Sequence, residues 1–227
     1  MGAAPGRLVR EAVLVAAAFA VLYLVTMTGS HHEAEDSLAY AAGIRGGHAR
    51  DVLNQNHLAW GALGWLVYNG ARGLGLASTA LAPLQVMDAL LGAIGAGILW
   101  RFVRGRGFGV GAAAVTCGIL CLSYGYWYYS GEAEVYILSA VVLIVCFVAA
   151  HRAATEPSPR AFALLGLATG VAVLAHDTNV LFATVAAAAL LTAAPRIGRR
   201  ALVRCAASYA AAAGAVVAAA YAAAATV

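Results

Sequence analysis

Long apolar runs fill this sequence and leave room for only short polar connections between them. A helix needs about 20 residues, at 1.5 Å per residue, to cross a bilayer, and several runs approach this length. The candidates are residues 11–28, 57–75, 80–103, 108–128, 134–151, 160–175, 179–194 and 201–225. Hydrophobic residues make up 63% of the chain and charged residues 11%, which leaves too little polar surface for a soluble domain. The sequence therefore predicts an all-α, polytopic membrane helix bundle.

The arginines decide which of these runs cross the membrane, because cytoplasmic loops carry an excess of basic residues. If the run 57–75 crosses, the nine arginines after Trp100 all lie outside the cell. If it does not cross, eleven of the fourteen basic residues share the cytoplasmic side. The run also contains His57 and Arg72, which suit a membrane surface better than its centre. We therefore expect seven spans in the inner (cytoplasmic) membrane, a cytoplasmic N-terminus and an extracytoplasmic loop, about 29–79, with membrane-surface helices.

The positive charge of the chain reflects this topology and not a nucleic-acid partner. The formal net charge is +4, but the arginines lie in short loops and form no basic patch with aromatic residues. The lipid bilayer is therefore an expected partner, and nucleic acid is not. We expect a single transmembrane module, 1–227. Because its last apolar run ends without a polar tail, we also expect that the chain is an N-terminal fragment whose C-terminal part is missing.

Small residues inside the apolar runs predict close contacts between helices. The glycines with this expected role are Gly92, Gly95, Gly97, Gly166 and Gly170. The cysteines have no other soft metal ligand near them in the sequence, and we interpret them as small buried hydrophobes; they are Cys117, Cys121, Cys146 and Cys205. The segment 155–159 contains two prolines and is typical of a turn.

The long loop opens with acidic residues. Ser30 and Glu33 fit a capping box, in which each side chain satisfies a backbone amide at the start of a helix. Asp36 lies further along the chain, where a cap cannot explain it. We therefore take Asp36 as the first candidate for a catalytic base or metal ligand and Glu35 as the second.

Two more segments combine polar and aromatic residues. Asn56 and His57 start the run 57–75; they form either a polar turn or a site in which a neutral histidine binds a phosphate oxygen, a metal or a hydroxyl. The segment 124–136 holds a belt of aromatic residues followed by Glu132 and Glu134. Such belts are common at membrane interfaces, and their rings also stack on sugars. The helix dipole favours acids in a first turn but does not require two, and Glu134 is the candidate we choose.

His176, Asp177 and Asn179 close a later apolar run. Asp177 could cap the next helix, whereas His176 has no such explanation in the sequence. A carboxylate from the first loop, one from 132–134 and His176 could hold a divalent cation, so that the expected ligands of any metal are Asp36, Glu134 and His176.

Asp88 lies well inside an apolar run, where an unpaired charge costs several kcal/mol. We expect it to be protonated, paired or turned towards a wet cavity. Gln85, one helical turn earlier, is its expected partner.

In this order, these segments resemble the GT-C superfamily of membrane glycosyltransferases, and in particular the bacterial relatives of protein O-mannosyltransferases. The shared outline is a first span, a long outer loop that opens with an acidic motif, and helices along the membrane surface. The segments that carry the resemblance are Glu35-Asp36-Ser37, Asn56-His57-Leu58-Ala59-Trp60, Glu132-Ala133-Glu134-Val135-Tyr136 and Ala175-His176-Asp177-Thr178-Asn179. The chain departs from the family in its shorter length and in the missing glycine and second acid around Asp36-Ser37.

The resemblance implies transfer of a sugar from a polyprenyl-phosphate donor to an acceptor at the extracytoplasmic face of the membrane. Asp36 would act as the general base, with Glu35 and Glu134 as the other catalytic candidates. The expected substrate-binding residues are Asn56, His57, Tyr128, Tyr136, His176 and Asn179, together with three arginines of the outer face as phosphate contacts, Arg45, Arg50 and Arg72.

Two other functional classes remain open from the sequence. A transporter would also place polar groups within a helix bundle, but it should show inverted repeats and broken helices, and we find no internal repeat. A non-catalytic scaffold protein would tolerate the loss of Asp36, whereas a transferase would not.

Overall fold

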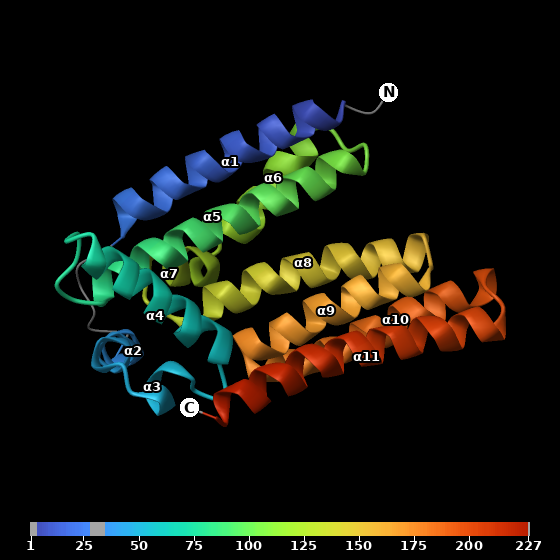
Figure 1. Ribbon diagram of the computed structural model, residues 1–227. Helices are drawn as coiled ribbons and strands as arrows, with labels where there is room; N and C mark the ends of the chain where they lie inside the picture. The colour runs from blue at the N-terminus through green and yellow to red at the C-terminus, as the bar shows by residue number, and fades with distance from the viewer. Residues whose placement is uncertain (1–3, 28–34, 227) are drawn as a thin grey trace. The chain divides into compact units, whose positions relative to one another are not determined.

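The computed structural model describes residues 4–27 and 35–226, and within them every regular element is a helix (Figure 1). The chain forms two compact units. The first comprises Met1–Val52 and Gly61–Val141, and the second comprises Leu53–Trp60 and Val142–Val227. The expectation of a single module, 1–227, stays a prediction.

The N-terminal helices are α1 (Pro5–Thr26), α2 (Glu35–Gly46), α3 (Ala49–Val52), α4 (Leu58–Gly73), α5 (Leu81–Gly105), α6 (Val110–Cys121), α7 (Tyr124–Gly131) and α8 (Val135–Thr155). Most of them lie in the first unit, whereas α4 and α8 have residues in both units. The second unit continues with α9 (Pro159–Ala175), η1 (Asp177–Phe182), α10 (Ala183–Ala193), η2 (Ala194–Arg196) and α11 (Arg199–Ala224).

Five helical segments in the described residues are long and apolar enough to cross a membrane, so the chain is a membrane-embedded helical protein. They are Pro5–Thr26, Leu81–Gly105, Val135–Thr155, Asp177–Arg196 and Arg199–Ala224. A sixth candidate is the bent pair of α6 and α7, and α9 is a shorter apolar helix. The predicted runs coincide closely with these helices. None of α2, α3 and α4, which fall in the predicted surface loop, qualifies as a span.

In the first unit, α1 lies along α5 (Figure 1). The contact is close because Gly97 has no side chain: a Cβ atom there would lie 2.9 Å from the carbonyl oxygen of Ala12. An ion pair joins the same two helices. Glu11 accepts hydrogen bonds of 2.9 Å from Arg104 Nε and of 3.3 Å from the indole N–H of Trp100. The apolar helix pair therefore has its register fixed by a polar contact.

The predicted span 108–128 is not one straight helix. It breaks after Cys121, and α6 and α7 meet at a bend of 66°. The break frees carbonyl groups that a continuous helix would use, and Tyr23 of α1 donates to one of them, the carbonyl oxygen of Cys121, at 2.9 Å. After the break, Tyr126 of α7 donates to the carbonyl oxygen of Gly92 inside α5 at 2.9 Å.

In the second unit, α9 begins where the sequence predicts it, after the turn 155–159. Ser158 accepts a hydrogen bond from the amide of Ala161 at 3.2 Å, and Pro159 occupies the first helical turn, where a missing N–H has no cost. Helix α9 then packs tightly against α11. A Cβ atom at Gly170 would lie 2.8 Å from Cβ of Val216, so the absence of a side chain at Gly170 permits the close approach that we predicted.

The cysteines are free and buried, as predicted. The core of the second unit is formed by large side chains of α9, such as Phe162 and Leu165, packed with alanines and with Cys205 of α11. Small residues on one side and larger ones on the other let these helices pack closely.

Replacement of Gly170 by alanine should lower the melting temperature of the protein. The new methyl group would overlap Val216 and cost about 1–3 kcal/mol. Gly214 of α11 is a matched control, because its Cβ atom would meet nothing within 4 Å. We expect Gly214→Ala to be neutral or slightly stabilising, since alanine is the better helix former. Equal melting temperatures of the two variants, measured in detergent, would contradict this packing.

The Glu11→Gln substitution should also lower the melting temperature, because it leaves the partly buried guanidinium of Arg104 without its carboxylate. Glu156→Gln is the control. Glu156 pairs with Arg152 at 3.6 Å, but both side chains are more than half exposed, at 68% and 67%, and such pairs contribute little. A loss of stability in Glu156→Gln as large as that in Glu11→Gln would show that the ion pair between α1 and α5 has no special importance.

Candidate functional site

Two buried acids occupy the short connection between α7 and α8. Glu132 is 3% exposed and Glu134 is 4% exposed. The sequence placed them in the first turn of the next helix, but α8 begins only at Val135. The helix dipole alone therefore does not account for their position, and the surrounding helices must satisfy them.

Hydrogen bonds from α2 and α5 hold this connection. Ser37 of α2 donates to Oε1 of Glu134 at 3.3 Å, and the backbone amide of Glu134 donates to Oδ2 of Asp88 at 3.1 Å. Gln85 donates to Oε2 of Glu132 at 3.4 Å. The sequence predicted Gln85 as the partner of Asp88. In the structure, Gln85 bonds Glu132 and Asp88 bonds the amide of Glu134, at the two ends of the segment 132–134. Acidic residues from three parts of the first unit therefore gather at one point.

Glu134 is the most perturbed acid of this cluster outside the membrane-spanning helices. Its pKa is raised to about 7, mainly by burial and in part by the nearby negative charges of Asp36 and Glu132, while the hydrogen bond from Ser37 opposes the shift. Its Oε2 atom is buried without a hydrogen-bond partner. Near neutral pH, Glu134 can therefore hold a proton in a place where a charged carboxylate is disfavoured.

Asp36 lies beside Glu134 and is exposed. Tyr40, one helical turn further along α2, shares this environment: burial raises its pKa to about 12, and the charges of Asp36 and Glu134 add to the shift. Ser37 and Tyr40 were not predicted as site residues, although the spacing of Asp36 and Tyr40 on one helix face could have indicated the tyrosine. The site thus combines an exposed carboxylate with a buried, proton-holding one.

Part of the predicted acidic motif lies outside the described residues. Ser30 and Glu33 belong to the segment 28–34, and α2 is described from Glu35 onwards without the side chain of Glu35. The roles of Glu33 and Glu35 therefore stay predictions.

The aromatic belt is a continuous chain of ring contacts. The rings of Tyr124 and Tyr128 are stacked with centroids 5.5 Å apart, Tyr128 meets Tyr129 edge to face at 5.2 Å, and Tyr129 lies 4.7 Å from Tyr136. Tyr136 and Tyr40 interact electrostatically. The two predicted substrate-binding tyrosines, Tyr128 and Tyr136, are therefore connected to the acidic cluster through neighbouring rings of the same unit.

The other two predicted motifs meet in the second unit. The backbone amide of Asp177 donates to the carbonyl oxygen of Asn56 at 2.9 Å, and His57 is buried. His176 has a structural role that the sequence did not reveal. Its Nδ1 atom lies 2.8 Å from Oγ1 of Thr178 and accepts weakly from the Thr178 amide, so that it caps η1.

Asn179 is also explained by local structure, because its side-chain amide donates to the carbonyl oxygen of Ala172 at 2.8 Å and closes the end of α9. The four motifs thus form two pairs, Asp36 with 132–136 in the first unit and Asn56-His57 with 176–179 in the second. The substrate-binding roles of Asn56, His57, His176 and Asn179 stay predictions.

The three arginines of the predicted outer face are exposed. Arg45 lies nine residues after Asp36 on α2, which is about 13 Å along the helix. Arg50 faces Asp51 at 3.6 Å, and Arg72 lies in the last turn of α4. A role in phosphate binding stays a prediction for each of them, and α2 places Arg45 at the far end from Asp36.

Among the described residues, no group of three or more His, Cys, Asp or Glu side chains is arranged to hold a metal ion. Of the three expected ligands, Asp36 and Glu134 belong to the first unit and His176 belongs to the second. A metal ion held by Asp36, Glu134 and His176 therefore stays a prediction.

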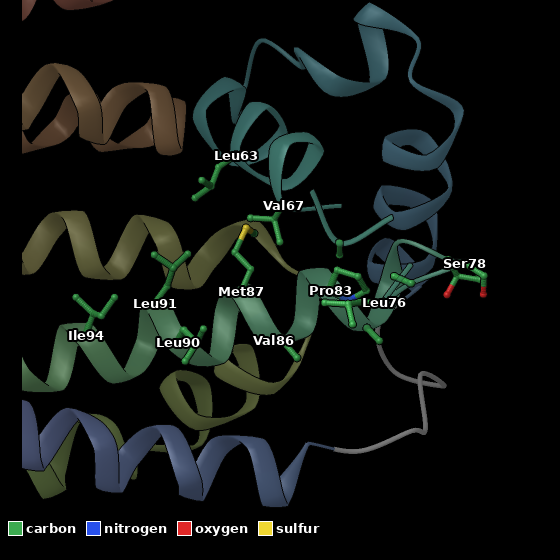
Figure 2. A pocket seen from close by; sticks show the side chains of 14 residues that line it. Leu63, Val67, Leu76, Ser78, Pro83, Val86, Met87, Leu90, Leu91 and Ile94 are labelled. Atoms are coloured by element: carbon green, nitrogen blue, oxygen red, sulfur yellow. The ribbon is translucent and has the colours of Figure 1, made fainter. Parts of the chain in front are cut away.

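An apolar groove of about 650 Å³ runs between α4 and α5 (Figure 2). Leu63 and Val67 of α4 face Met87, Leu90 and Leu91 of α5 across it, and Ser78 lies at one end. The helix positions that line the groove are on the opposite side of α5 from Gln85 and Asp88. Helix α5 therefore separates a hydrocarbon-lined surface from the polar cluster.

No protein-family model, curated protein or solved structure matches this chain.

The raised pKa of Glu134 predicts a pH dependence of stability. The folded state holds this proton up to about pH 7, whereas the unfolded state releases it near pH 4.5. Because the folded state binds more protons in this interval, stability falls as the pH rises from about 4.5 to about 7, by up to about 3 kcal/mol. Glu134→Gln should remove this dependence, whereas the exposed control Glu156→Gln should keep it. Parallel curves of melting temperature against pH for wild type and Glu134→Gln would contradict the assignment.

Proposed function

We propose that this protein is a membrane glycosyltransferase of the GT-C type, which moves a sugar from a polyprenyl-phosphate donor to an acceptor at the extracytoplasmic face. The observation that carries the proposal is the pair of carboxyl groups in the first unit: Asp36 is exposed to an incoming substrate, and the adjacent Glu134 has a pKa near 7. Perturbed acids of this kind are typical of catalytic sites. The motif resemblance supplies the reaction class.

In the proposed reaction, Asp36 acts as the general base. It takes the proton from an acceptor hydroxyl as that oxygen attacks the anomeric carbon of the donor sugar. The bond from this carbon to the phosphate oxygen breaks, and its electron pair leaves with the polyprenyl phosphate. No covalent intermediate between sugar and protein is needed. A protonated Glu134 avoids a second negative charge beside Asp36 while Asp36 takes up the proton, which Asp36 then releases to solvent.

The membrane helices suit such a donor. A polyprenyl chain needs an apolar surface, and the groove between α4 and α5 provides one of about 650 Å³. A chain in this groove with its phosphate towards Ser78 would bring the head group to the N-terminal end of α5, where it would have to pass around this helix to reach the side of Gln85. Arg72 directly follows Ala71, which lines the groove, and is the candidate phosphate contact that we favour.

The proposed topology has seven spans and a cytoplasmic N-terminus in the inner membrane. The seven spans would be the five long helical segments, the bent pair α6–α7 and the short helix α9. With this arrangement, α2, α3 and α4 lie on the extracytoplasmic side together with Asp36 and Glu134, and most arginines lie in the cytoplasm.

A cysteine placed in the segment 76–79 should then react with an impermeant thiol reagent in intact cells.

Transport is the second candidate, and one observation favours it. The span formed by α6 and α7 is broken at Leu122-Ser123, and broken helices line the sites of many transporters. The buried Asp88 inside α5 would also fit a proton pathway. The transfer assay below separates the two functions, since a transporter has no sugar-transfer activity.

The Asp36→Asn variant should lose sugar transfer. In membranes that contain the protein and a radiolabelled polyprenyl-phosphate sugar, loss of the general base should reduce transfer about 10²- to 10⁴-fold. Glu156→Gln, an exposed acid between α8 and α9, is the control and should be as active as wild type. Undiminished transfer by Asp36→Asn would rule out its role as the base, and absence of transfer by wild type from every donor would favour the transporter.

A further inference from the structure

A second, smaller pocket lies in the first unit, at the aromatic belt. Its volume is about 210 Å³, and the described residues that line it are Thr26, Tyr124, Trp127, Tyr128, Gly131 and Glu132. It is smaller than the 300–1,000 Å³ typical of pockets for drug-sized ligands. The space therefore fits a single ring and not an extended chain, unlike the groove between α4 and α5.

The walls of this pocket are flat and aromatic. Tyr124 and Tyr128 are one helical turn apart on α7, and their rings are nearly parallel, with an angle of 16° between them. Two rings stacked in this way face each other, so the pair offers a ligand an outer aromatic face and does not surround it from several sides. A pyranose ring has a flat face of C–H groups that packs on such a surface, whereas a quaternary ammonium is best held by rings at steep angles to each other.

The rim of the pocket carries a carboxylate. The indole N–H of Trp127 donates to Oγ1 of Thr26 at 2.8 Å, and the Thr26 hydroxyl donates to the carbonyl oxygen of Leu22 at 2.7 Å, so both donors are already used within the protein. Glu132 supplies the carboxylate, which can accept several hydrogen bonds. Sugar hydroxyls can donate to it while the ring packs on the aromatic face. A cation also suits an aromatic face, so tetramethylammonium is the competing ligand that the test must exclude.

The pocket is joined to the proposed catalytic site by direct contacts. Gln85 hydrogen-bonds Glu132 at the wall of the pocket, and the next acid, Glu134, lies beside Asp36. The aromatic contacts continue from Tyr128 through Tyr129 to Tyr136. A ring bound against Tyr124 and Tyr128 would therefore lie next to the segment 132–134 that carries the chemistry.

From these contacts we infer that the pocket formed by Tyr124, Tyr128, Trp127 and Glu132 is a binding subsite for one pyranose ring. The inference rests on the proposed function for the identity of the substrates, and it assigns a sugar-stacking role to α7. The ring belongs either to the donor or to a glycan acceptor, since both present the same chemistry.

The test is direct binding of simple glycosides to the purified protein in lipid nanodiscs. Methyl α-D-mannopyranoside and methyl β-D-glucopyranoside are the probes, and the fluorescence of Trp127 is the signal, identified by its loss in Trp127→Phe. Tyr124 is 75% exposed, so its replacement should not disturb folding. We expect Tyr124→Ala to weaken binding of the preferred glycoside about 10-fold and Tyr124→Phe, which keeps the ring, to bind like wild type.

Three results would overturn the inference. The first is no response to either glycoside at about 100 mM, which is about 100-fold above a dissociation constant of about 1 mM. The others are equal binding by wild type and Tyr124→Ala, and a response to tetramethylammonium chloride alone. Addition of the polyprenyl-phosphate sugar distinguishes the two sources. It should compete with the glycoside if the donor sugar occupies the pocket, and it should leave glycoside binding unchanged if the acceptor does.

Failure of this inference is distinguishable from failure of the proposed function. Binding of a glycoside does not need transfer, and Asp36→Asn should bind it normally. If the glycoside binds but no donor supports transfer, only the proposed function is wrong. If wild type transfers sugar and Tyr124→Ala does so with an unchanged KM for donor and acceptor, only the subsite is wrong.

Discussion

A bilayer offers no water to buried polar groups, and this constraint explains most of the polar contacts of the first unit. Each group must find its partner within the protein. Tyr23 therefore bonds the carbonyl freed at the end of α6, and Tyr126 bonds the carbonyl of Gly92 in α5. The Asp88 carboxylate accepts the backbone amide of Glu134 at the start of α8. These bonds link α1 to α6, α7 to α5, and α5 to the segment before α8, and the last of them lies in the acidic site.

The same constraint makes the exception informative. Oε2 of Glu134 is buried without a hydrogen-bond partner, although its neighbours are bonded. A protein normally avoids such an atom because desolvation costs about 1–3 kcal/mol. A protonated carboxyl group costs less than a charged one, which agrees with the raised pKa. Strain of this kind is expected where a group has to bind or exchange a proton during a reaction.

The sequence predicted the helices well because apolar length and glycine spacing are local properties. The predicted runs and the close contacts at Gly97 and Gly170 agree with the structure. The contacts of the site were less predictable, because they depend on which helices become neighbours. Ser37 and Asp88 meet Glu134 from positions 97 and 46 residues away, and His176 caps its own helix, a role that only the backbone conformation reveals. The break after Cys121 was not predicted, although Ser123 and Gly125 follow it directly in the sequence.

The bend after α6 has a consequence for the membrane itself. Helix α6 has 12 residues, which corresponds to about 18 Å, well short of the roughly 30 Å of the hydrocarbon core. If α6 and α7, which meet at 66°, form one span, its apolar length is shorter than the hydrocarbon core, and the lipids next to it would thin to meet it. Thinning would lower the head-group region locally towards the aromatic belt. A lipid-linked substrate could then reach the carboxylates while its phosphate stays hydrated.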